Sequence, residues 1–427
     1  MPRAIELFEQ VIAIDPDYAS AYASLALALI WSDEHVSVRD PRVEAAVNRA
    51  LALDPGNSEA LTALGELRAE QNRQEEAREL LEQAIANNPN NAFAYRWLGT
   101  SYMDADPVRY YALSRKAFEV NPLDPTIRYH LALAATMLGR YDDALAAAQG
   151  LSPGYRDQMA GDVHHHFGHL DKSLKSFYRA YRTWGSFGAL TRELMMMKEY
   201  DLVEAWLREG GPIHTKVNLA AVRGEPNKAF RLWADAAEQQ QDAGTDWTVG
   251  VAHIRFTGDF DAARELLERY LLEPGQTVPR FDPNHWQPLI EYALALQRTG
   301  SPERAAELIG DIRAFIETRV AAGVVRDRFD LNFQFWLSAL HAMSGDTQQA
   351  VAALRHAAPQ GGLTCTHCVR MWPHWENLRG DPEFDRVLAE VETSKAVLRQ
   401  RLADEGMLLT PEEVLQLEEF SFDPFVN

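Results

Sequence analysis

Residues 58–91 read SEALTALGELRAEQNRQEEARELLEQAIANNPNN, a segment with two helical apolar periods separated by a polar turn. Its apolar residues recur three or four positions apart, which is the spacing of one buried helix face. Pro89 ends the second period, because proline lacks an amide donor and its ring clashes with a continuing helix. Gly65 and Ala77 are small, so they let the two helices approach closely while Leu81 fills the space beside them. The segment therefore predicts a tightly packed helical hairpin.

The same pattern recurs along the chain. Its proline stops at Pro16, Pro55, Pro89 and Pro122 are 39, 34 and 33 residues apart, and a spacing near 34 is typical of stacked helical hairpins. Further along, a glycine turn separates the two helices of each pair, and it begins at Gly139, Gly168, Gly224, Gly258, Gly300 and Gly345. Glycine suits the left-handed residue that closes a helix. A degenerate form of this turn, which begins at Lys198, fills the gap between Gly168 and Gly224.

Residues 58–91 resemble the tetratricopeptide repeat (TPR) family, and the next repeat carries Tyr95, Leu98, Gly99 and Tyr102 in the same register. The resemblance implies an all-α fold, a right-handed α-solenoid of about ten TPR-like helical hairpins with a C-terminal capping helix. It divides the chain into the second half of an incomplete repeat (1–18), well-matched repeats (19–152), degenerate TPR-like repeats (153–360), a CxxC loop with the capping helix (361–405) and an acidic tail (406–427).

Features at both ends raise the expectation of a larger protein. Residues 1–18 look like the second helix of a hairpin, and Phe8 and Ile12 have core rather than cap character. A solenoid end normally carries a polar-faced cap, so truncation is favoured over a lone capping helix. Residues 378–384, LRGDPEF, resemble the closing motif of TPR regions in bacterial signalling proteins. That resemblance implies a nucleotide-cyclase or winged-helix domain upstream of Met1.

Composition narrows the function classes. The chain has 42 Lys and Arg against 62 Asp and Glu, so its formal net charge is −20. An acidic surface repels phosphate groups, which disfavours nucleic-acid and membrane partners. HExxH, GxxxxGK[ST] and GxSxG motifs are all missing from the sequence, so it predicts no catalytic site and no cofactor. Because neither a secretory signal nor a membrane-spanning apolar segment is visible, we expect a cytoplasmic protein.

The segment Cys365-Thr-His-Cys368 contains the only two cysteines of the chain. Thiolates three positions apart can chelate one zinc ion, with His367 or His374 among the further ligands. The pair could instead form a reversible disulfide or remain as two loop thiols. Most CxxC pairs without a second cysteine pair are not structural zinc sites, so loop thiols are favoured and no metal is expected.

In TPR proteins the first helices of successive hairpins line a groove that receives a peptide or partner segment. The resemblance assigns such groove positions to Glu59, Thr62, Glu66, Arg96, Thr100, Tyr129, Gln158, Asp162, His165, His166 and Arg192. By the same register, His164 is expected to point into the core while His165 and His166 face the groove. The lysines and asparagines of the clamp that binds chaperone C-termini are missing, which argues against a chaperone adaptor.

These observations favour a non-enzymatic scaffold that binds a protein or peptide partner in its groove, as the regulatory or interaction part of a larger bacterial signalling protein. The alternative is an α/α-toroid enzyme that acts on a glycan with paired carboxylates. An RNA-binding solenoid is a third alternative, although it conflicts with the net charge of −20. The sequence identifies neither the partner nor the oligomeric state.

Overall fold

The computed structural model describes residues 2–31, 40–71, 73–184, 188–207, 212–240, 245–272, 276, 278–327, 332–360, 366–408 and 410–416. Every regular element in these ranges is helical, and one isolated β-bridge joins Arg326 to Asn332. The chain divides into two compact units, Met1–Leu151 and Ser152–Asn427. Among the described helices, none is both long enough and apolar enough to cross a membrane.

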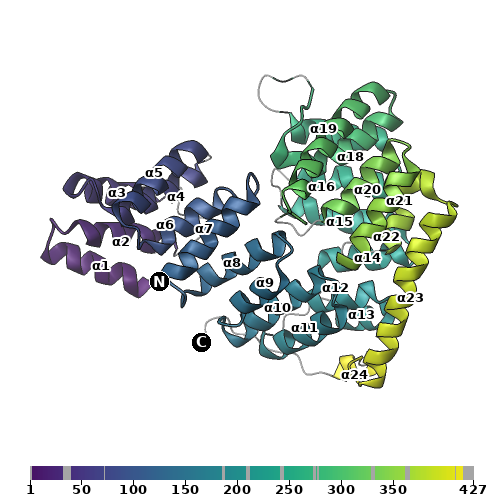
Figure 1. Cartoon of the computed structure of the whole chain (residues 1–427), viewed down its shortest axis with the longest axis horizontal. Helices are drawn as coiled ribbons and strands as arrows, with labels where there is room; N and C mark the ends of the chain where they lie inside the picture. Colours follow the sequence, from purple (N-terminus) through teal and green to yellow (C-terminus); the bar gives the residue numbers. More distant parts are fainter. Residues whose placement is uncertain are drawn as a thin grey trace. The chain divides into compact units, whose positions relative to one another are not determined.

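The first unit is a row of helical hairpins (Figure 1), each made of two consecutive helices in extensive contact. It begins with α1 (Pro2–Ile14), which packs against α2. The hairpins that follow are α2/α3 (Ala19–Ile30, Pro41–Leu53), α4/α5 (Ser58–Glu70, Gln74–Asn87), α6/α7 (Ala92–Thr100, Pro107–Val120) and α8/α9 (Pro125–Met137, Tyr141–Ala148).

The second unit continues with hairpins of less regular length. They are α10/α11 (Pro153–His166, Leu170–Trp184), α12/α13 (Gly188–Met196, Tyr200–Leu207), α14/α15 (Ile213–Val222, Pro226–Gln240), α16/α17 (Thr245–Ala252, Phe260–Leu271), α18/α19 (Trp286–Arg298, Pro302–Ala321) and α20/α21 (Phe333–Met343, Thr347–Ala357). Shorter elements are the π-helical turn η1 (His253–Thr257), the 3-10 turns η2 (Pro283–His285), η3 (Ala358–Gln360) and η4 (Pro373–Leu378), and α22 (Thr366–Met371), α23 (Pro382–Asp404) and α24 (Pro411–Gln416). Across its described residues the chain thus forms the all-α array of about ten hairpins that the sequence predicts.

Polar residues determine where several helices begin. Side-chain oxygens of Asn57, Asn91, Asp106 and Asp124 accept hydrogen bonds from the first backbone amides of α4, α6, α7 and α8. These caps satisfy amides that have no partner inside the helix. The prolines of α7 and α8 occupy the first helical turn, where a missing amide hydrogen costs nothing. The recurring Asp-Pro and Asn-Pro pairs therefore end one helix or start the next.

Gly65 allows the close helix approach that the sequence predicts for α4 and α5. A Cβ atom at this position would lie 2.8 Å from Leu81 Cγ and 3.3 Å from the backbone oxygen of Ala77. Both separations are shorter than normal carbon and oxygen contacts, so a larger residue would push the two helices apart.

The predicted glycine turns all adopt the left-handed conformation. The six glycines have φ between 67° and 82°, and Lys198, which begins the degenerate turn, has φ 64°. Its amide bonds to Met195 O, and the amide of Glu199 bonds to Leu194 O. This is the same pair of helix-closing hydrogen bonds that surrounds Gly224. Lys198 is the only non-glycine residue with positive φ in the described ranges.

Replacing Lys198 with glycine is expected to raise the free energy of unfolding by about 1 kcal/mol, because a side chain is strained in the left-handed region. The change also removes an ion pair of 2.5 Å between Lys198 Nζ and Glu392 Oε2. Because the lysine side chain is half exposed, the loss of this ion pair costs less than about 0.5 kcal/mol. Urea denaturation followed by circular dichroism measures the difference. Gly224→Ala is the control and should be destabilising by a similar amount. No gain for Lys198→Gly would contradict the prediction.

Helix α23 packs along several hairpins of the second unit and is not confined to the last one. It contacts α21 and α22 near its start, while Leu398 and Leu402 near its end pack against the apolar core of α11, α12 and α13. Ion pairs join it to the same hairpins, including Arg401 Nη2 to Asp171 Oδ2 at 2.6 Å. Figure 1 shows α23 running along the unit from α22 to α24. The capping helix thus also ties early hairpins of this unit to its last one.

Candidate functional site

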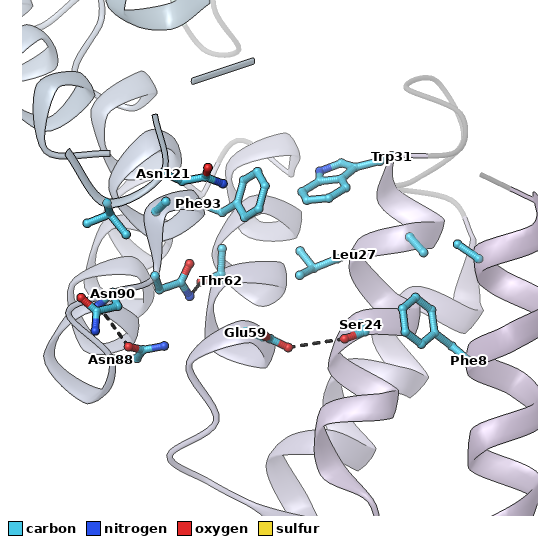
Figure 2. A pocket seen from close by; sticks show the side chains of 15 residues that line it. Phe8, Ser24, Leu27, Trp31, Glu59, Thr62, Asn88, Asn90, Phe93 and Asn121 are labelled. Atoms are coloured by element: carbon cyan, nitrogen blue, oxygen red, sulfur yellow. Dashed lines mark hydrogen bonds between the residues drawn. The ribbon is translucent and has the colours of Figure 1, made fainter. Parts of the chain in front are cut away.

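A pocket of about 530 Å³ opens in the first unit, beside α1, α2 and α4 (Figure 2). We call it the Trp31 pocket. Its lining comes from α1, α2, α4, the segment before α6 and the end of α7, and consists of Ala4, Phe8, Ser24, Leu27, Ala28, Trp31, Glu59, Thr62, Asn88, Asn90, Asn91, Ala92, Phe93, Val120 and Asn121.

Aromatic and aliphatic side chains form one side of this pocket. The rings of Trp31 and Phe93 lie 4.8 Å apart between centroids and are tilted by 51°. Leu27 lies next to Trp31 on α2, and Phe8 reaches the pocket from α1, as Figure 2 shows. Side chains of this kind supply most of the binding energy where proteins recognise peptides or small molecules.

Polar groups occupy the rest of the lining. Glu59 is the only charged residue among the lining residues, and its Oε2 accepts a hydrogen bond of 3.4 Å from Ser24 Oγ. Asn88, Asn90 and Asn121 place side-chain amides at the rim. An amide side chain both donates and accepts hydrogen bonds, so it can pair with a peptide backbone. The pocket therefore combines an apolar wall with uncharged hydrogen-bonding groups and one negative charge.

Asn91 fixes the position of α6 relative to α4 beneath the pocket. Its Oδ1 accepts from Ala94 N at 3.0 Å, while its Nδ2 donates to Ser58 Oγ at 2.8 Å and to Thr62 Oγ1 at 2.9 Å. Thr62 in turn donates to Ser58 O at 2.8 Å. These bonds are buried, so each is costly to break. The site is thus held on rigid helices rather than on a flexible loop.

An acidic and a basic residue, Glu66 and Arg96, lie buried near this site. Burial raises the pKa of Glu66 to about 8, although Arg96 and a hydrogen bond from Trp31 oppose the shift. The Arg96 guanidinium stacks 3.9 Å from the Trp97 ring centroid, and its Nη1 lies 3.4 Å from His130 Nε2. Burial likewise lowers the pKa of Arg96. Glu66 is therefore mostly protonated at neutral pH.

Stability of the first unit is expected to fall as the pH rises from 5 to 8, because Glu66 holds its proton in the folded state and loses it in the unfolded one. Glu66→Gln resembles the protonated form, so its advantage over wild type should grow by on the order of 3 kcal/mol across this range. Urea denaturation at pH 5, 6, 7 and 8 measures it. Glu79→Gln on the exposed face of α5 is the control. Parallel curves for wild type and Glu66→Gln would contradict the assignment.

The remaining groove residues predicted for the first unit lie outside the Trp31 pocket. Thr100 donates from Oγ1 to the backbone oxygen of Arg96 at 2.9 Å, which is a bond within α6. Tyr129 is 43% exposed on α8, with its ring 5.5 Å from that of His130. Of the six positions assigned in this unit, the structure thus places Glu59 and Thr62 in the pocket.

Four of the five residues predicted in the second unit belong to one polar network: Gln158, Asp162, His165 and Arg192. Asp162 accepts from Gln158 Nε2 at 3.2 Å and from Arg192 Nη2 at 3.0 Å. His165 Nδ1 lies 2.6 Å from Oε1 of the fully buried Glu193. Burial alone would raise the pKa of Glu193, but His165 and Arg192 outweigh it and lower the pKa. Glu193, the centre of this network, was not among the predicted residues.

The histidine run of α10 is oriented differently from the prediction. His165 and His166 are buried, whereas His164 is about half-buried. His164 is thus the least buried of the three, contrary to the expectation that it alone points into the core. The reason is that the inner side of α10 is covered: Glu193 reaches His165 from α12, and Arg326 donates a hydrogen bond to the backbone oxygen of His166.

The cysteine segment is described from Thr366 onward. Cys368 is disulfide-bonded, so the favoured loop-thiol interpretation is wrong for this residue. Cys365 lies outside the described residues. His374 is buried with its Nε2 3.1 Å from Glu291 Oε2, and no group of three potential metal ligands is found in the described part of the chain.

The most apolar parts of the Trp31 pocket were not identified from the sequence. Trp31 follows the last turn of α2, and Phe93 lies in the first turn of α6, more than sixty positions away. A signal was nevertheless present, since both are large aromatic residues beside helix ends where the repeat pattern requires none. Neighbouring repeats must be stacked before these two residues meet.

Two family models match the chain, and both describe the tetratricopeptide repeat. One covers residues 43–97 and the other residues 111–155. The chain thus contains tetratricopeptide repeats. Glu59, Thr62 and Phe93 of the Trp31 pocket lie within the first TPR match. Tetratricopeptide repeats generally bind proteins or peptides, so part of the pocket lining lies in a segment of a known interaction class.

Solved TPR structures are similar to parts of this chain. YrrB, "a TPR protein with an unusual peptide-binding site", is 21% identical and covers 44% of this chain and 97% of its own, with a TM-score of 0.33. PilF of Pseudomonas aeruginosa is 20% identical, covers 43% and 85%, and has a TM-score of 0.35. The human IFIT1 dimer with PPP-AAAA is 15% identical, covers 63% and 67%, and has a TM-score of 0.38. Among curated proteins, none matches the chain.

Proposed function

We propose that the first unit binds an extended segment of a partner protein in the Trp31 pocket. The segment places a large apolar side chain against Trp31 and Phe93 and a lysine or arginine near Glu59. The observation that carries this proposal is the combination of one aromatic wall and one carboxylate in a single recess of about 530 Å³. Its position on the repeats of an interaction family supports it further.

The chemistry of the lining explains why a peptide fits better than a phosphate ligand. The only charge in the lining is negative, and the chain as a whole carries −20, so anions are repelled. Rim asparagines supply donors and acceptors that match a peptide backbone. No proton or electron transfer is needed, and the role is that of a non-enzymatic scaffold.

Selection of random peptides displayed on phage tests this proposal. The full chain is the bait, and a double variant, Trp31→Ala with Phe93→Ala, is the counter-bait. Enriched peptides should carry a large apolar residue close to a lysine or arginine, and they should be lost on the double variant. Peptides that bind both baits equally, or that are enriched in acidic residues, would overturn it.

We further propose that the chain is the interaction part of a larger bacterial signalling protein. The support is the resemblance of residues 378–384 to the closing motif of such proteins. The motif spans the start of α23, where Asp381 Oδ1 accepts hydrogen bonds from Glu383 N and Phe384 N at 2.9 Å. An immunoblot of native cell extract tests the idea. A single band at 48.1 kDa, which is the mass of this chain, would contradict it.

A further inference from the structure

A second cavity, of about 380 Å³, lies within the second unit. Tryptophans from four separate elements line it: Trp233 on α15, Trp247 on α16, Trp336 on α20 and Trp372 just after α22. Cavities of this size hold small organic ligands, and indole rings offer large rigid apolar surfaces. We call it the tryptophan cavity.

An ion pair forms the polar side of the tryptophan cavity. Arg255 Nη2 donates to Glu291 Oε1 at 2.6 Å, and both residues line the cavity. The guanidinium also stacks 3.9 Å from the Trp372 ring centroid. His374 Nε2 lies 3.1 Å from the other carboxylate oxygen of Glu291. The negative charge of Glu291 is therefore already neutralised by Arg255, and no unpaired charge of the cavity is left to form an ion pair with a ligand.

Among its described residues, the lining also holds three buried donor atoms without a hydrogen-bond partner, against one such acceptor atom, Glu291 Oε2. The indole Nε1 of Trp336, the indole Nε1 of Trp247 and the Nε of Arg255 are buried atoms with no acceptor in the described structure. Trp336 is only 4% exposed as a residue. Leaving a buried donor unpaired costs roughly 1–3 kcal/mol each. Three residues of one cavity therefore carry donors that an acceptor could satisfy.

The backbone beneath Arg255 is also unusual. Arg255 lies on η1, a π-helical turn that continues α16 from His253 to Thr257. Such turns insert an extra residue into a helix and occur frequently at functional sites. In this chain the turn carries Arg255, which reaches the cavity between α16 and α18.

We infer that the tryptophan cavity binds an uncharged, flat organic molecule that carries carbonyl or similar acceptor groups. Its ring system packs against the indoles, and its acceptor receives hydrogen bonds from Trp336 Nε1 and its neighbouring donors. A cation would suit the indole faces, but Glu291 is already paired with Arg255. An anion would meet that carboxylate at close range. This site is independent of the Trp31 pocket, which lies in the other unit.

Three probes that share a naphthylmethyl group and differ in charge test the inference on the full chain. They are 2-naphthylacetamide, 2-naphthylacetate and (2-naphthylmethyl)trimethylammonium, with affinities measured by saturation-transfer NMR and calorimetry. We expect the amide to bind at least tenfold more tightly than either ion. Trp336→Phe keeps an aromatic ring but removes the indole donor, so it should lower the affinity for 2-naphthylacetamide by about fivefold.

Trp206→Phe is the matched control, because Trp206 lies in the apolar core of α11–α13 and does not line the cavity. It should leave the affinity unchanged. If Trp336→Phe does not fold, Trp247→Phe removes a second donor at a half-buried position. Equal binding of either ion, equal effects of the cavity and control variants, or no binding of any probe at millimolar concentration would overturn the inference.

Discussion

Glu291→Ala is expected to lower the free energy of unfolding of the second unit by about 3–5 kcal/mol, since it leaves a buried arginine without its counter-ion. Glu291 is 2% exposed on α18, and it accepts from Arg255 at 2.6 Å. The side chain of His374, on the opposite carboxylate oxygen, is fully buried. Removing the carboxylate therefore leaves a fully buried imidazole and a guanidinium that is only 15% exposed without their acidic partner. Urea denaturation followed by tryptophan fluorescence measures the loss.

Two comparison variants separate the buried ion pair from charge removal in general. Glu307→Ala removes an exposed pair of 2.7 Å with Arg304 on α19 and should change stability by less than about 0.5 kcal/mol. Glu291→Gln keeps the volume and one acceptor, so its loss should be intermediate. If Glu291→Ala stays within about 1 kcal/mol of wild type, the pair does not stabilise the unit as described.

The ion pair between Glu291 and Arg255 also makes the stability of the second unit depend on pH. Burial alone would raise the pKa of Glu291, but His374 and Arg255 outweigh burial and lower it to about 2. Because the folded pKa lies below the ordinary value of 4.5, the stabilisation is present above that value and is lost as the pH falls toward 2. The difference between wild type and Glu291→Ala should therefore shrink over this interval.

Trp31→Ala is expected to weaken the binding of a selected peptide by about 2 kcal/mol, which raises its Kd roughly thirtyfold. The indole is the largest side chain in the Trp31 pocket, and it lies 4.8 Å from the Phe93 ring between centroids. Its loss removes one side of the apolar wall that receives the peptide's anchor side chain. Fluorescence anisotropy with a labelled peptide from the selection measures the change.

Tyr18→Ala is the control for this measurement. Tyr18 is an aromatic residue of the same unit, 50% exposed and outside the pocket lining, so its replacement should leave the affinity unchanged. Glu59→Arg adds a second criterion, because it should disfavour peptides with a lysine or arginine and leave uncharged ones much less affected. A peptide that binds Trp31→Ala as tightly as wild type would place the binding site elsewhere.

The repeat architecture was predictable because it depends on local signals. Proline stops, small residues such as Gly65 and the glycine turns each act within one hairpin. Even the exception at Lys198 followed the register, since its φ of 64° matches that of the glycines at equivalent turns. Because the repeat occurs about ten times, an irregular residue at one position does not change the predicted architecture.

The candidate sites were predictable only in part. The register placed Glu59 and Thr62 on the face that lines the Trp31 pocket, but it did not indicate that Trp31 and Phe93 would meet there. It also placed His165 and His166 in the groove, but it did not indicate that Glu193 of α12 and Arg326 would contact them. A helical period tells which residues share a face, not which element covers that face.

The sequence by itself determined the helices, their pairing and their turns, because backbone geometry and apolar spacing within about thirty-four residues suffice for these. Only the tertiary structure decided which polar and aromatic residues come together. Glu291 meets Arg255 and His374, and four tryptophans gather around one cavity, through elements up to 139 positions apart. Such contacts depend on how successive hairpins rotate against each other and on the path of α23, and these arise from packing summed over many residues.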